Sequence, residues 1–167
     1  MKQIRSVLAA HQASHRQPLT KVAHGLAVML MFFGAMIPLS WLGTIAAGAP
    51  VTLAMIVVSV LLLAAYELSN RLGVALTLLL MPMLYAAHLI SELNAIEGAL
   101  IAATSIAVGV AVERLAHARL EGRPTDMTHT LREFVLGPLW LGQELLGALG
   151  IAADSGSILS SAKSIAR

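Results

Sequence analysis

The residues best suited to chemistry follow a long apolar run, in a stretch at 113–124 that is the densest cluster of ionisable side chains in the chain. On a helix, Glu113, His117 and Glu121 are spaced by four residues, so their side chains share one face. A histidine between two carboxylates can be held in one tautomer and kept basic, which suits a metal ligand or a proton relay. A solvated, salt-bridged helix end would show the same pattern, so the choice between them depends on the other histidines.

Two further histidines lie near the amino terminus. Pro18 favours the start of a helix, because its missing N–H costs nothing in the first turn. His24 is then one to two turns inside the first apolar helix, and His15 lies just ahead of the proline. Both are therefore expected close to one face of a membrane.

The remaining histidines are weaker candidates. His88 lies 16 residues into a later apolar segment, which at about 1.5 Å per residue places it near the opposite membrane face. The sequence leaves open whether a break in this helix at Pro82 brings His88 back to the membrane face of the other histidines. His11 and His129 are expected to be exposed or to cap helices.

The composition predicts an integral membrane protein. Apolar residues make up 57% of the 167 positions and charged residues only 12%, whereas a soluble domain is about one quarter charged. The chain has no cysteine, so a metal would need imidazole and carboxylate ligands, which suit iron, zinc or manganese. The net charge of +2 is small and does not indicate a nucleic-acid partner.

A helix needs about 20 apolar residues to cross a bilayer, and several apolar runs approach this length. They predict an all-α, polytopic membrane bundle. A fifth apolar segment carries Gln143 and Glu144, and a charge there costs about 2.5–3.5 kcal/mol on insertion scales. It is therefore expected either to cross with Glu144 facing the bundle or to re-enter. Four spans are expected at 22–47, 51–68, 72–90 and 99–112, the fifth segment at 134–152, one membrane domain over 1–152, and a loosely ordered tail at 153–167.

The distribution of lysine and arginine predicts the orientation. The expected loops at 44–50 and 91–98 contain neither residue, so four crossings with a cytoplasmic amino terminus place the flanking cations in the cytoplasm. We expect a bacterial inner-membrane protein in which His15, His24 and His117 meet at the cytoplasmic face. The flanking cations are Lys2, Arg5, Arg16, Lys21, Arg71, Arg114, Arg119, Arg123 and Arg132.

Two motifs resemble one known family. His15-x-x-Pro18-x-Thr20-x-x-x-His24 resembles the H-x-x-P-x-N-x-x-x-H motif of the fungal 2-hydroxy-palmitic acid dioxygenases, small multi-span proteins of fatty-acid alpha-oxidation. The second motif of that family is matched by His117, Glu121 and Arg123, and a Gly-Pro pair and Glu144 follow at about the family's distances. The resemblance covers roughly residues 8–150.

The chain departs from the family around these matches, so it resembles a diverged, bacterial member. Thr20 stands where asparagine is usual, and Glu113 stands where glutamine is usual. Ala116 and Ala118 replace the glycines beside the histidine.

The resemblance implies an Fe(II)-dependent dioxygenase that uses O₂ to shorten 2-hydroxy fatty acids by one carbon. It implies His15, His24 and His117 as iron ligands, with His88 as a further candidate. Glu121 would be a ligand or would orient a histidine. Arg123 would bind the substrate carboxylate bidentately.

Two other functions fit the sequence. In a structural or interaction membrane protein, the histidines and carboxylates would only satisfy one another. A proton-coupled transporter fits less well, because the charges cluster at one face rather than along the midplane of a span.

Overall fold

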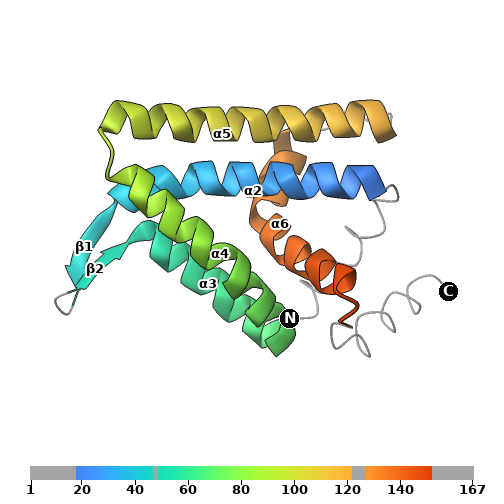
Figure 1. The fold of residues 1–167 in the computed structure, drawn as a ribbon, viewed down its shortest axis with the longest axis horizontal. Coiled ribbons are helices and arrows are strands. Elements are labelled where there is room, and N and C mark those ends of the chain that lie inside the picture. Colours follow the sequence, from blue (N-terminus) through green and yellow to red (C-terminus); the bar gives the residue numbers. More distant parts are fainter. Residues whose placement is uncertain (1–17, 47–48, 122–126, 152–167) are drawn as a thin grey trace.

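The computed structural model describes residues 18–46, 49–121 and 127–151, and within them the chain is mostly helical (Figure 1). One short antiparallel hairpin interrupts the helices. In chain order the elements are α2 (Pro18–Trp41), β1 (Gly43–Ala46), β2 (Ala49–Thr52), α3 (Leu53–Leu68), α4 (Asn70–Ser91), α5 (Ala95–Ala116), the π-helix η1 (His117–Glu121) and α6 (Met127–Ala148).

Helices α2 and α5 lie side by side and antiparallel (Figure 1). Their backbones approach so closely that a Cβ atom on Gly34 would lie 2.7 Å from the carbonyl oxygen of Ala102. A Cβ atom on Gly109 would lie 2.8 Å from the carbonyl oxygen of Ala27. Small residues at such contacts are typical of helices that associate in membranes, where close backbone packing drives association.

The α3–α4 hairpin diverges from this pair, and α6 packs against both α2 and α4 (Figure 1). Glycines again allow the approach on each side of α6. A Cβ atom on Gly137 would lie 2.7 Å from the Val28 side chain, and one on Gly142 would lie 2.8 Å from the Leu72 side chain. The fully buried Trp140 of α6 therefore lies in the core between the two helix pairs.

Three helices in the described part of the chain are long and apolar enough to cross a membrane, which indicates a membrane protein. They cover Leu19–Trp41, Asn70–Ser91 and Ala95–Arg119. Helix α3 is apolar but has only 16 residues. At about 1.5 Å per residue it spans about 24 Å, less than a hydrocarbon core of about 30 Å. The predicted count of four spans and one further segment thus stays a prediction.

The first predicted span is too long, because α2 ends at Trp41 and the chain then forms the β-hairpin. The hairpin pairs Thr44 with Val51, and such β-branched residues suit strands. Thr52 then caps α3, its hydroxyl accepting a hydrogen bond from the Met55 N–H at 3.3 Å. Strand pairing of 43–46 with 49–52 thus replaces the helix expected beyond Trp41.

Helices α5 and α6 begin earlier than predicted. The Asn94 side chain accepts a hydrogen bond from the Glu97 N–H at 2.9 Å, which caps α5 and shortens the expected loop at 91–98. Helix α6 begins at Met127 rather than near 134. The predicted tail at 153–167 lies outside the described residues.

Candidate metal centre

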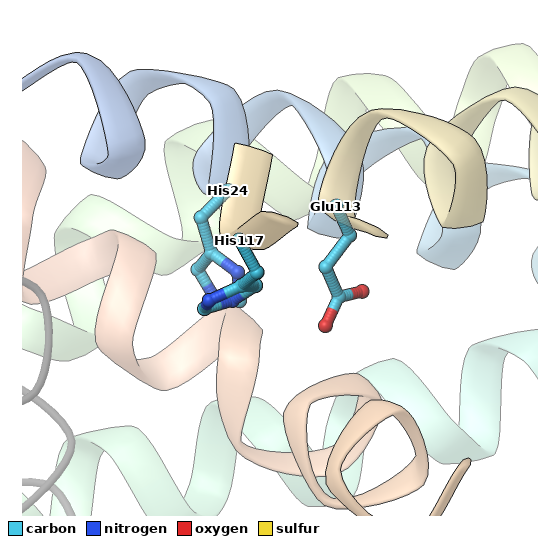
Figure 2. A group of neighbouring side chains, drawn as sticks. All are labelled: His24, Glu113 and His117. Carbon is cyan, nitrogen blue, oxygen red and sulfur yellow. The ribbon is translucent and has the colours of Figure 1, made fainter. Parts of the chain in front are cut away.

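Three buried side chains converge where α2 meets the end of α5 (Figure 2). His24 comes from α2, Glu113 from α5, and His117 from the start of η1. Their exposed fractions are 1%, 0% and 4%, respectively. One potential ligand atom from each residue lies within 4.8 Å of those of the other two. These residues could together hold a metal ion.

Local helix geometry explains how the group forms. Glu113 and His117 are four residues apart, so they share one face at the end of α5. The antiparallel packing of α2 against α5 brings His24, in the second turn of α2, to the same level. The π-helical turn that begins at His117 is a rare conformation that occurs frequently at functional sites.

Helix α6 covers the group from the side of the bundle core. The Trp140 ring is fully buried, and its centroid lies 4.8 Å from that of His24 at an interplanar angle of 72°. One turn further along α6, Glu144 accepts hydrogen bonds from the Lys21 ammonium at 3.0 and 3.1 Å. This ion pair joins α6 to the first turns of α2, close to His24. Glu144 is thus paired with a cation of α2, whereas the choice between crossing and re-entry for this segment stays a prediction.

The donor set fits a divalent metal ion. Metal–nitrogen and metal–oxygen bonds of about 2.0–2.2 Å allow two ligand atoms on one ion to be at most about 4.4 Å apart. Three ligands cannot all lie at that maximum separation on one ion, so the three side chains would move closer together on binding it. A buried carboxylate is also costly unless its charge is compensated, and a cation would compensate that of Glu113.

Thr20 supports this fit from the preceding turn of α2. Its side chain is fully buried, and its hydroxyl has no hydrogen-bond partner among the described residues. Buried hydroxyls in proteins almost always find a partner. Water or another ligand at the centre could satisfy this one.

The structure brings together two of the four predicted metal ligands, His24 and His117. Their third partner is Glu113, which the sequence placed on the face of His117 but did not identify as a ligand. Three further residues were predicted at this centre. His15 and Arg123 lie outside the described residues, as does the side chain of Glu121.

His88 does not belong to this group. It lies near the carboxyl end of α4, where its Nε2 atom is 3.5 Å from a carboxylate oxygen of Glu92. Its side chain is 41% exposed. Helix α4 continues through Pro82 to Ser91, so the proline does not return His88 to the other histidines.

Sequence reasoning did not identify Trp140 as a neighbour of His24, although Trp140 is fully buried in α6. Apart from the Gly-Pro pair and Glu144 of the family resemblance, its segment was marked only by the polar pair at 143–144. That pair was the available signal, because polar residues in an apolar helix face the interior of a bundle.

No family model, curated protein or solved structure matches the chain.

Proposed function

We propose that the protein is an Fe(II)-dependent membrane dioxygenase that removes one carbon from 2-hydroxy fatty acids. The observation that carries the proposal is the buried group of His24, Glu113 and His117. Two histidines and one carboxylate with open coordination positions are the ligand set of many non-haem Fe(II) oxygenases. The motifs around His24 and His117 support the choice of substrate by their resemblance to the 2-hydroxy-palmitic acid dioxygenases.

The proposed reaction balances without a further reductant. A 2-hydroxy acid and O₂ give the acid one carbon shorter, CO₂ and water, with cleavage of the bond between C1 and C2. The substrate loses four electrons, and O₂ gains four. Iron bound at the centre would supply Lewis acidity and O₂ activation, and its open positions suit the hydroxyl and carboxylate of the substrate.

The residues of the chain hold and enclose such a site. His24 and His117 supply neutral ligands, and Glu113 lowers the net charge of the centre. Trp140 packs against His24 and helps to keep bulk water from it. The acyl chain would lie among the apolar helices, with its polar head at the end of the bundle where His24 lies.

Residues beyond the described part have proposed roles that rest on the family resemblance. Arg123 would bind the substrate carboxylate through its planar fork, and Glu121 would orient a ligand. His15 would be a further ligand. A cytoplasmic amino terminus in a bacterial inner membrane would place this site at the cytoplasmic face.

The test is turnover by anaerobically purified, iron-loaded protein in detergent. With 2-hydroxypalmitate and O₂, we expect pentadecanoic acid, CO₂ and one O₂ consumed per product formed. Palmitate, which lacks the 2-hydroxyl, should not react. If the iron-loaded protein turned over neither 2-hydroxypalmitate nor its longer homologues, the proposed substrate would be rejected. If the protein did not bind iron, the alternative of a structural or interaction membrane protein would be favoured instead.

A single substitution tests the role of the carboxylate clamp. Arg123→Ala should raise KM more than it lowers kcat, because it removes binding that is equal in the ground state and the transition state. The control is Arg119→Ala, which removes an arginine outside the carboxylate-binding role. Equal KM values for Arg123→Ala and the unmodified protein would remove Arg123 from the proposal.

A further inference from the structure

Thr20 carries a buried hydroxyl that no described residue satisfies. Its side chain is fully buried, and its Oγ1 atom has no hydrogen-bond partner among the described residues. The hydroxyls of Ser40 and Thr77 instead donate to the carbonyl oxygens four residues earlier in their helices, each at 2.8 Å. Helix α2 begins at Pro18, so no carbonyl of this helix lies four residues before Thr20. Because buried hydroxyls almost always have a partner, this one is available to a bound molecule.

Thr20 lies on the face of α2 that packs against α5 (Figure 1). Ala27 and Gly34 mark this face, because their backbones lie against Gly109 and Ala102 of α5. Thr20 precedes Ala27 by seven residues, as Ala27 precedes Gly34, and seven residues make close to two helical turns. The Thr20 side chain therefore belongs to the same helix–helix interface.

The antiparallel register of the two helices places Thr20 level with His117. Seven residues before Ala27 on α2 correspond to seven residues after Gly109 on α5, which is Ala116. Ala116 is buried, and α2 contacts the π-helical turn that begins at the next residue, His117. Thr20 is thus level with one histidine of the candidate metal centre and one helical turn from the other.

The chemistry of this position suits a group that holds a ligand of the metal rather than the metal itself. Two histidines and one carboxylate leave coordination positions open to small molecules. A threonine hydroxyl can donate one hydrogen bond, and such bonds are stronger when the acceptor is charged. We propose that Thr20 is a positioning residue, whose hydroxyl donates a hydrogen bond to an anion at an open coordination position of the metal. This role rests on the metal centre of the proposed function, in which that anion is the substrate.

The test measures azide binding to the cobalt-loaded full chain in detergent, followed by the visible absorption of the metal. Azide is a small anion that needs no lipid site. Thr20→Val keeps the shape of the side chain but removes the hydroxyl, so it should weaken azide binding about tenfold. Thr20→Ser keeps a hydroxyl and should restore most of the affinity. Both variants should bind cobalt nearly as tightly as the unmodified protein, because its three ligands remain.

Thr77→Val is the matched control, because it makes the same change at a hydroxyl that already donates to the Gly73 carbonyl oxygen in α4. It should leave azide binding unchanged and should lower the Tm of the metal-free protein, since it breaks a hydrogen bond. Thr20→Val should not lower the Tm of the metal-free protein, because it removes a buried hydroxyl that has no partner among the described residues. A merely structural role for Thr20 predicts the opposite.

Two results would overturn this role. One is azide affinity of Thr20→Val equal to that of the unmodified protein. The other is a Tm of metal-free Thr20→Val as low as that of Thr77→Val, which would assign the hydroxyl to a hydrogen bond within the chain.

Failure of the proposed function would look different. A chain that bound no cobalt would lack the metal centre, and the role of Thr20 would be rejected with it. Cobalt-loaded protein that bound azide through Thr20, but did not bind 2-hydroxypalmitate in the absence of O₂, would support the positioning role and reject only the proposed substrate.

Discussion

Two histidine–glutamate pairs with the same four-residue spacing lie at opposite ends of the helix bundle (Figure 1). Glu113 and His117, at the end of α5, are 0% and 4% exposed. The side chains of His88 and Glu92, at the end of α4, are 41% and 64% exposed. The spacing alone therefore does not distinguish a candidate metal site from a solvated ion pair.

The difference comes from the neighbouring helices. At the end of α5, α2 supplies His24 and α6 supplies the Trp140 ring, so the pair gains a third ligand and a cover. At the end of α4, no third potential ligand joins His88 and Glu92 within the part of the chain that the structure describes. Burial and a ligand from a second helix thus distinguish the candidate metal centre.

The largest effect is expected from Glu113, and Glu92 provides its control. Glu113→Gln keeps the shape of the side chain but removes a ligand charge. It should weaken metal binding by more than the roughly 10–100-fold that loss of an outer partner costs. Glu92→Gln is the matched control and should leave metal affinity unchanged. Chelator competition measures the metal affinity of both variants. Equal affinities would mean that the end of α5 does not differ from the end of α4 as a metal site.

A smaller effect is expected from the packing that brings the ligands together. In Gly109→Ala the new methyl group would lie 2.8 Å from the Ala27 carbonyl oxygen and would separate α2 from α5. We expect a loss of about 1–3 kcal/mol in the free energy of unfolding, together with weaker metal binding.

The control for this packing change lies in α6. A Cβ atom on Gly147 meets nothing within 4 Å, so Gly147→Ala should instead gain up to about 1 kcal/mol of helix stability. Reversible unfolding in mixed micelles measures both variants. Unchanged stability and metal affinity in Gly109→Ala would show that the close contact does not position His24.

The smallest effect is expected from the ion pair that joins α6 to α2. The Lys21 and Glu144 side chains are 34% and 26% exposed, so solvent screens part of their attraction. A double-mutant cycle with Lys21→Met and Glu144→Gln should give a coupling of about 0.2–1 kcal/mol. Metal content should change little, because the Trp140 contact remains. A loss of metal as large as that in Glu113→Gln would make this pair essential to the centre.

Much of the site was predictable from local pattern. The four-residue spacing placed Glu113 and His117 on one face, and the one-sided cations placed His24 at the same membrane face. Glu113 was not identified as a ligand, because its burial depends on how closely Gly34 and Gly109 allow α2 and α5 to pack. The periodicity of a sequence does not predict how closely the backbones of two helices approach each other.

The fold was predicted less completely at its connections and in α6. Continuous hydrophobicity predicted α3, α4 and α5, but it could not distinguish the hairpin at 43–52 from helix, because β-branched and apolar residues suit both. The position of α6 depends on Gly137 and Gly142, which permit contacts with two different helices. Those contacts join residues far apart in sequence, and so does the contact of Trp140 with His24.

The most direct test of the central claim is metal analysis combined with X-ray absorption on protein purified and iron-loaded without oxygen. We predict about one iron per chain, bound by nitrogen and oxygen ligands with an imidazole signature. His24→Ala and His117→Ala should each lose most of the iron, whereas His88→Ala should retain it. Equal iron content and unchanged spectra in all three variants would contradict a metal centre built from His24, Glu113 and His117.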